Sequence, residues 1–79
     1  MMTLRSEYFI KHAPETELNE KKSVIRAEID VDTADELPET DGISGRILHQ
    51  GSSAFIVKEG RLAVLSGDGH WYENGEMIK

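Results

Sequence analysis

Apolar and charged residues alternate through Ser23 to Val31, and this pattern constrains the fold more than any other feature of the chain. The segment reads S-V-I-R-A-E-I-D-V, so every second residue from Ile25 onwards is apolar and the residues between them are charged. A period of two is that of a strand with one face on a core and the other in water. No window shows sustained helical periodicity, so we expect a mostly β fold without a long helix.

Short apolar runs separated by turn residues fill the last third of the chain. Glu59-Gly60, Ser66 to Gly69 and Asn74-Gly75 are the turn segments. Asn-Gly is the preferred dipeptide of a tight type I′ hairpin turn. The pattern predicts an antiparallel meander. Its runs are Ser53 to Lys58, Arg61 to Leu65, His70 to Tyr72 and Glu76 to Ile78.

The segments around the strongest strand are harder to assign. Asp32 to Pro38 predicts at most one short helical turn, capped by an Asp or Thr side chain and ended by Pro38. Thr3 to His12 is a strand or a partly ordered arm that stops at Ala13-Pro14, because proline disfavours a helical residue before it. Glu15 to Lys22 is almost wholly polar and predicts an exposed loop or hairpin tip.

These elements predict a small antiparallel sheet or meander with at most one short helical turn. Residues 1–22 form an N-terminal arm or hairpin, ordered in part, and residues 23–79 form a single small β domain. A chain of 79 residues without cysteine has neither a large core nor a disulfide to reinforce it. We therefore expect it to be stabilised by self-association, as a homo-oligomer.

The charge of the chain narrows the range of partners. Its net charge is −6, and Lys21-Lys22 is the one adjacent basic pair. This balance argues against binding nucleic acid or an anionic membrane surface. No apolar stretch approaches the length needed to cross a bilayer, and the first residues lack the apolar core of a signal peptide. We expect a cytoplasmic protein, or a component of a virion.

Candidate catalytic and metal-binding motifs do not meet the requirements of their chemistry. The acidic residues between Asp30 and Asp41 fail the spacing of a calcium-binding EF-hand loop. His12, His49 and His70 lack the spacing of a zinc site, and no cysteine completes one. Asp68 could form an acid/base couple with His70, although turn chemistry explains the pair more simply. We expect no enzymatic activity, no metal and no cofactor.

The aromatic residues are expected to pack mainly in the core. Trp71 and Tyr72 are adjacent in an extended segment, so their side chains must point to opposite faces. We predict that Trp71 packs over the hairpin that contains Phe55, near Leu37-Pro38. Tyr72 then points outward and is a candidate interface residue.

The order of motifs between Ile29 and Tyr72 resembles the small β modules of tailed-bacteriophage and prophage structural proteins. The resemblance covers about half the chain and is one of pattern. Its features are the alternating strand, the Leu37-Pro38 segment and glycine turn, and three short runs. Those runs are Gly51 to Val57, Gly60 to Leu65 and Asp68 to Tyr72. Such modules act by assembling in multiple copies, so the resemblance implies a protein partner, either a second copy or a larger component of a particle.

Two functions of different classes follow from these observations. The first is a non-enzymatic structural or assembly protein of a phage or prophage, which acts by self-association or by docking on a larger component. The second is a small acidic binding module or regulator that engages a basic protein through the run from Asp30 to Asp41. Salt separates the two, because an acidic docking face weakens as ionic strength rises.

Overall fold

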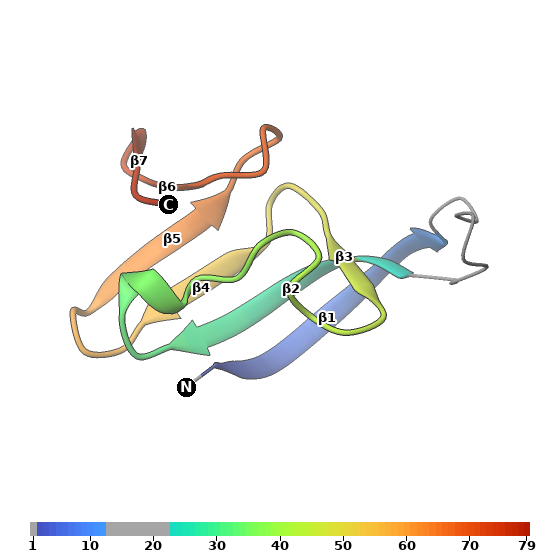
Figure 1. Ribbon diagram of the computed structural model, residues 1–79, viewed down its shortest axis with the longest axis horizontal. Coiled ribbons are helices and arrows are strands. Elements are labelled where there is room, and N and C mark those ends of the chain that lie inside the picture. The colour runs from blue at the N-terminus through green and yellow to red at the C-terminus, as the bar shows by residue number, and fades with distance from the viewer. Residues whose placement is uncertain (1, 13–22) are drawn as a thin grey trace.

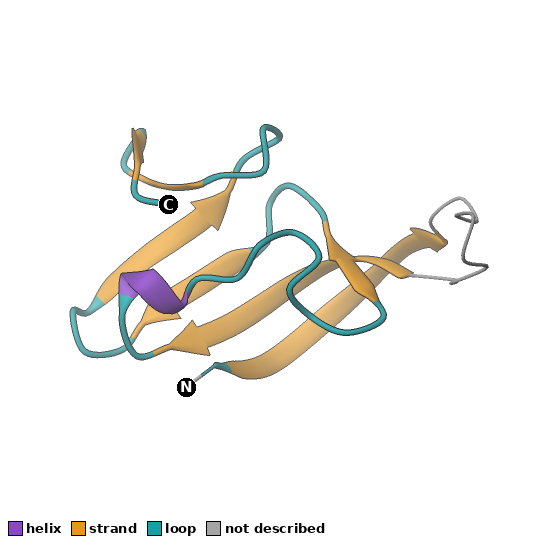
Figure 2. Ribbon diagram, viewed as in Figure 1, coloured by secondary structure: helices purple, strands orange, loops and turns teal. Residues whose placement is uncertain are grey.

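The computed structural model describes residues 2–12 and 23–79, which form one sheet of seven strands and a single 3₁₀ turn (Figures 1 and 2). The predicted mostly β fold with one short helical turn is confirmed. The elements are β1 (Thr3–His12), β2 (Ser23–Val31), η1 (Ala34–Glu36), β3 (Arg46–Leu48), β4 (Ser53–Ile56), β5 (Arg61–Leu65), β6 (Trp71–Glu73) and β7 (Glu76–Met77).

The strands lie in the order β1-β2-β4-β5-β6-β7, and β3 also pairs with β2. The predicted antiparallel meander is confirmed for β4 to β7. The sheet is mostly antiparallel, as predicted, and the sequence did not indicate that β2 pairs in parallel with both β3 and β4. The segment between β2 and β4 carries the chain back across one face of the sheet (Figure 2), so that β4 starts beside the middle of β2.

β1 pairs antiparallel with β2 along nearly its whole length, from Thr3 opposite Asp30 to His12 opposite Ser23. The first of the two alternatives for this segment, a strand, is therefore the one observed. This strand lies in the same sheet as the strands of residues 23–79. Two predictions lie outside the described residues. These are the end of the first segment at Ala13-Pro14 and the loop over Glu15 to Lys22.

The edge of β2 changes partner in its middle, and a serine side chain fills the gap. β3 pairs with β2 as far as Ile25, and β4 pairs with it from Glu28 onwards. Between these ladders, the Ala27 backbone N–H donates to Ser52 Oγ over 3.1 Å, and Ser52 Oγ donates to the His49 carbonyl over 2.8 Å. Ser52 is fully buried. Its hydroxyl is thus a structural substitute for a missing backbone partner.

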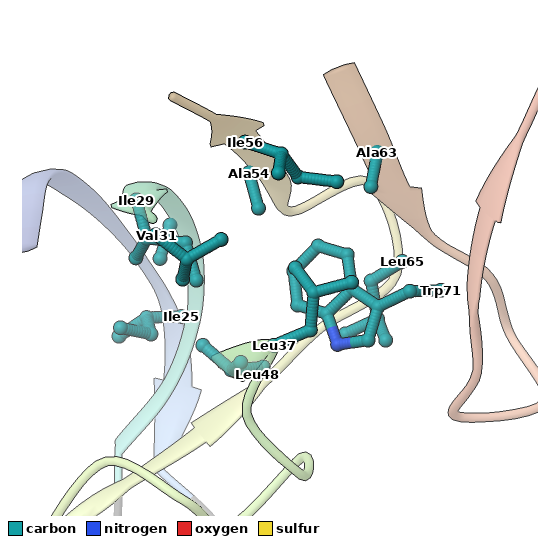
Figure 3. Close-up of a cluster of buried hydrophobic side chains, with 11 residues drawn as sticks. Ile25, Ile29, Val31, Leu37, Leu48, Ala54, Ile56, Ala63, Leu65 and Trp71 are labelled. Atoms are coloured by element: carbon teal, nitrogen blue, oxygen red, sulfur yellow. The ribbon is translucent and has the colours of Figure 1, made fainter. Parts of the chain in front are cut away.

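The core lies between the sheet and the segment that crosses it, and Trp71 is its largest member (Figure 3). The Trp71 side chain is 1% exposed and shares the core with Leu37. Its Nε1–H donates to the Pro38 carbonyl over 2.8 Å, so the polar atom of the ring is also satisfied. The predicted packing of Trp71 near Leu37-Pro38 is confirmed.

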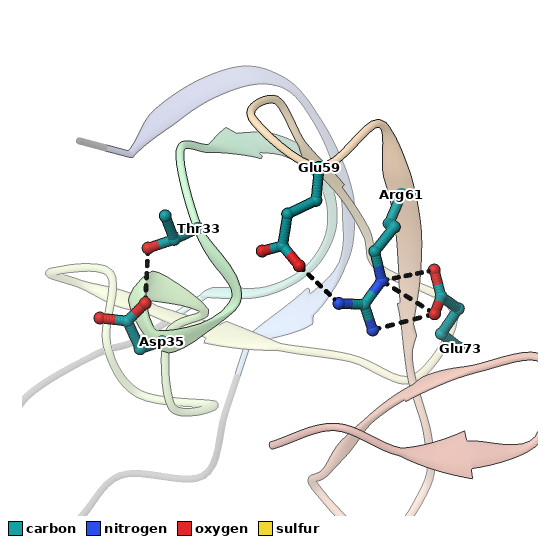
Figure 4. A network of polar contacts seen from close by, with 5 residues as sticks. All are labelled: Thr33, Asp35, Glu59, Arg61 and Glu73. Atoms are coloured by element: carbon teal, nitrogen blue, oxygen red, sulfur yellow. Dashed lines mark hydrogen bonds and ion pairs between the residues drawn. The ribbon is translucent and has the colours of Figure 1, made fainter.

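The short helical turn is present, but its predicted capping is wrong. Thr33 occupies the N-cap position of η1, but its side chain accepts no capping hydrogen bond; its hydroxyl donates to the Asp35 carboxylate instead (Figure 4). The Asp32 backbone N–H donates to Glu36 Oε1 over 2.9 Å. A side chain at the end of the turn therefore satisfies the donor that precedes it.

Replacing Trp71 with alanine should lower the free energy of unfolding by about 3–5 kcal/mol, because the largest core side chain is removed and the Pro38 carbonyl loses its donor. A domain of this size has little stability to spare, so unfolding is expected. Chemical denaturation followed by circular dichroism measures the change. Leu62→Ala, at an exposed apolar position, is the control and should have a much smaller effect. Equal losses would contradict this account of the core.

Replacing Ser52 with alanine should lower the free energy of unfolding by about 1–3 kcal/mol, because the buried Ala27 N–H is left without a partner. The neighbouring Ser53 is only partly buried, so Ser53→Ala should change stability by a few tenths of that amount. The same denaturation experiment compares them. Two indistinguishable variants would show that the hydroxyl is not needed at the change of partner.

Candidate interaction face

The sheet has one face on the core and one open face, and the register assigns residues to each. Residues directly opposite one another on paired strands lie on the same face. Ala54, Ile56, Ala63, Leu65 and Trp71 are all buried and define the core face. The residues between them in β4, β5 and β6 therefore belong to the open face.

Three rows of residues across the strands form the open face from Thr3 to Arg26, and a further row, Lys11 with Val24, lies beyond them. One row contains Thr3, Asp30, Phe55 and Leu62, and the next contains Ser6, Glu28, Ser53, Val64, Tyr72 and Met77. The third contains Tyr8 and Arg26. Polar side chains predominate over β1 and β2, and apolar side chains predominate over β4 to β7. The open face is thus divided into a polar half and an apolar half.

We call the apolar half the apolar patch. Phe55 is 39% exposed and Leu62 is 54% exposed, although they are cross-strand partners at its centre. Such pairs usually shield one another, so this degree of exposure indicates a surface without a covering layer. The patch consists of Phe55, Leu62, Val64, Tyr72 and Met77.

The turn at Asn74-Gly75 brings Met77 onto the patch. Asn74 has a φ of 50° and Gly75 a φ of 83°, the positive values that a type I′ turn requires at both central positions. The predicted hairpin turn is therefore confirmed. It places Met77 directly opposite Tyr72 and Glu76 opposite Glu73, so that the apolar member of β7 shares the face of Tyr72.

The charged residues of these three rows lie in the polar half of the open face. Arg26, Glu28 and Asp30 are the charged residues of the three rows. Arg5 extends to this group, with its Nε 3.0 Å from Asp30 Oδ1. The group contains two positive and two negative residues, whereas the whole chain has a net charge of −6. The excess negative charge therefore lies elsewhere.

The charged residues of the meander are paired on the other side of the sheet (Figure 4). Arg61 and Glu73 belong to the core-face positions of β5 and β6, and Arg61 Nε lies 2.9 Å from both carboxylate oxygens of Glu73. Arg61 Nη1 also donates to Glu59 over 2.7 Å. The hydrogen bond from Arg61 lowers the pKa of Glu73 and keeps it ionised. This network leaves the apolar patch free of these charges.

Tyr72 is held in place on the patch by Asp68. The Tyr72 hydroxyl donates to Asp68 Oδ2 over 2.6 Å, and the His70 backbone N–H donates to Asp68 Oδ1 over 2.9 Å. The Tyr72 bond is the larger cause of a lowered pKa at Asp68, and the same bond raises the pKa of Tyr72. Asp68 therefore orders the turn and fixes the aromatic side chain, as expected of turn chemistry.

The five residues predicted for packing or an interface fall into two groups. Leu37, Pro38 and Trp71 meet in the core, whereas Phe55 and Tyr72 lie on the open face. The expectation that aromatic residues pack mainly in the core is wrong for Phe55, and also for Tyr8 and Phe9, which are exposed. Ala54 and Ile56 occupy the core-face positions of β4, so Phe55 must point away.

Sequence reasoning missed Leu62, Val64 and Met77. Arg61 to Leu65 is apolar at four successive positions, so its periodicity does not show which residues are inward. Met77 could have been found from the Asn74-Gly75 turn, whose two-residue loop fixes the register of the hairpin and pairs Met77 with Tyr72.

Among the described residues, no three histidine or acidic side chains come close enough together to hold a metal ion. Within the same residues, no helix is long and apolar enough to cross a membrane. Comparisons of the chain with protein-family models, with curated proteins and with solved structures gave no match.

The bond between Tyr72 and Asp68 should be visible in a tyrosine titration. In a Tyr8→Phe background, Tyr72 is the single tyrosine, and its absorbance midpoint should lie above the ordinary value of about 10. Asp68→Asn should lower that midpoint, because the carboxylate that accepts the hydrogen bond from the hydroxyl is lost. Identical midpoints in the two proteins would contradict the assignment.

The same bond gives a stability contribution whose pH limits follow from the two shifts. The pKa of Asp68 is lowered by folding, so its contribution is present above the unfolded-state value and is lost as pH falls through the folded value. The pKa of Tyr72 is raised, so its contribution is present below the unfolded-state value and is lost as pH rises through the folded value. Asp68→Asn should therefore make the free energy of unfolding fall less steeply both at acidic pH and at alkaline pH.

Proposed function

We propose that this chain is a non-enzymatic assembly protein that associates with a second copy through its open sheet face. The apolar patch is the observation that carries the proposal. Exposed apolar surface of a few hundred Å², gathered in one place, is typical of protein interaction sites. Here it occupies the side of the sheet that no other described element covers, while the opposite side supplies the whole core.

A second copy fits this face better than a charged partner does. Two copies of a chain with a net charge of −6 repel one another through most of their surfaces. The open face is the exception, because Arg5, Arg26, Glu28 and Asp30 beside the patch balance and the apolar patch itself contains no charge. A two-fold arrangement that places patch against patch brings these neutral surfaces together, which is the self-complementary contact of a symmetric dimer.

The layout of the open face matches that of an interface. Stable interfaces have an apolar centre and a polar rim, and bury about 800 Å² on each partner. The patch supplies the centre, and Ser53, Glu28 and Arg26 lie beside it as rim residues. Tyr72 is fixed by Asp68 before any partner arrives, so less side-chain freedom is lost on association.

The non-enzymatic part of the proposal rests on the way that the polar groups are used. Asp68 accepts from Tyr72 and from the turn backbone, and the Ser52 hydroxyl is occupied by the β2 edge. Asp68 and Ser52 thus both have structural partners. The resemblance of the sequence to phage and prophage structural modules agrees with this proposal, since those proteins act in multiple copies, and it suggests a particle component as the setting.

Leu62→Lys should weaken self-association about thirty-fold or more while leaving the fold intact, because it places a charge at the centre of the patch. Sedimentation velocity over a concentration series measures the association, and circular dichroism checks the fold. Met2→Lys introduces the same charge at an exposed apolar residue outside the patch, and it should associate like the wild type. A wild-type chain that is monomeric throughout the series would overturn the proposal.

Added salt distinguishes this assembly from the alternative of an acidic module that binds a basic protein. Burial of the apolar patch should survive a rise in ionic strength, since no net charge is brought together. An acidic docking site would weaken as the screening length falls below about 8–10 Å. Self-association that disappears on adding salt would therefore count against the patch as its cause.

A further inference from the structure

β1 is the one long edge strand in the described part of the sheet. β7 forms the opposite edge and contains only Glu76 and Met77, whereas β1 spans the ten residues Thr3–His12 (Figure 1). β1 pairs with β2 on one side. An edge strand of this length presents a row of backbone N–H and C=O groups on its other side, and such a row is a template for a further strand.

Two irregularities limit the part of β1 that a further strand could use. The register with β2 shifts between Leu4 and Ser6, and again between Phe9 and Lys11. Shifts of this kind interrupt a ladder of hydrogen bonds. The regular stretch between them is Ser6 to Phe9, and a pairing strand would therefore be centred on these four residues.

Two of the three charged side chains of β1 are engaged within the chain, and the third, Lys11, lies beyond the regular stretch. Arg5 lies 3.0 Å from Asp30, and the Arg46 guanidinium contacts Glu7 with Nε 2.6 Å from Oε2. Hydrogen bonding to Glu7 raises the pKa of Arg46. After Glu7, Tyr8 is 68% exposed, and Phe9 is also exposed. The middle of the edge is thus apolar, and the two charges that precede it are already neutralised.

We propose that β1 pairs antiparallel with β1 of a second copy, about a two-fold axis at Tyr8. Such an axis stands perpendicular to the sheet, so residues placed opposite one another must share a face. Within the regular stretch, the axis can pass through Glu7 or through Tyr8. The first choice puts two carboxylates opposite one another, which is destabilising. The second pairs Tyr8 with its own copy and Glu7 with Phe9, and within the regular stretch it brings no like charges together. Arg5 and Lys11 would face one another only beyond the two register shifts.

This edge contact is separate from the open-face contact proposed above. It joins two sheets side by side into one continuous sheet and leaves the apolar patch of each copy accessible. One chain would then have two self-complementary surfaces, and alternating use of the two would extend an assembly beyond a dimer.

The test uses single cysteines, because the chain has none of its own. Opposite residues of antiparallel strands have Cα atoms about 4.5–5.5 Å apart, which suits a disulfide. Tyr8→Cys should therefore form a disulfide-linked dimer under mild oxidation. Ser6→Cys is the matched control: it lies on the same face, but the two copies of Ser6 would be four residues apart along the strands, about 13 Å. It should stay monomeric on a non-reducing gel.

Two further measurements keep the result interpretable. A mixture of Glu7→Cys and Phe9→Cys chains, in which Tyr8 is intact, should yield the mixed dimer in excess of either self-linked dimer. Tyr8→Cys should also cross-link in a Leu62→Lys background, where the open-face contact is removed. Equal cross-linking by Ser6→Cys, a monomeric Tyr8→Cys chain together with no mixed dimer, or cross-linking that requires Leu62 would each overturn the edge pairing.

Discussion

The fold depends on the packing of one indole ring against two alanines. Ala54 and Ala63 are cross-strand partners on the core face of the meander, and both are fully buried (Figure 3). Their small side chains leave room that the Trp71 ring fills, while its N–H reaches the Pro38 carbonyl. The ring thereby connects the C-terminal hairpin, the sheet and the crossing segment. In a chain this short, few other side chains could make all three contacts.

A core on one side of the sheet has a direct effect on the other side. The crossing segment and Trp71 cover one face, and no segment within residues 2–12 and 23–79 covers the apolar patch on the second. The polar residues of β1 and β2 suit exposure to water, whereas the apolar residues of β4 to β7 do not. The proposed function follows from this imbalance, because association with a second copy would cover the apolar patch that the fold leaves exposed.

The sequence predicted elements whose signals are local, and it did not predict contacts that depend on distant residues. Ser23 to Val31 shows its inward face by alternation, and Asn74-Gly75 specifies its turn by backbone preference. The parallel pairing of β2 with β4 leaves no local pattern, because the connection carries no long helix to mark a crossover. Phe55 lies among apolar neighbours on both sides, so its exposure was decided by the packing of Trp71 and not by its own run. Leu62 and Val64 were missed for the same reason.

The parallel ladder also bears on how fast the chain folds. Ala27 and Ser52 meet across 25 residues of sequence, whereas β4 and β5 are joined by a short turn. Closing a longer loop costs more chain entropy, and this cost arises before the stabilising contacts form. Topologies with distant pairings therefore fold more slowly. The meander is therefore suited to form early, with β2 and the crossing segment docking on it late. A meander that formed first would expose both of its faces until β2 and the crossing segment docked. During that time, premature association with other chains would compete with folding.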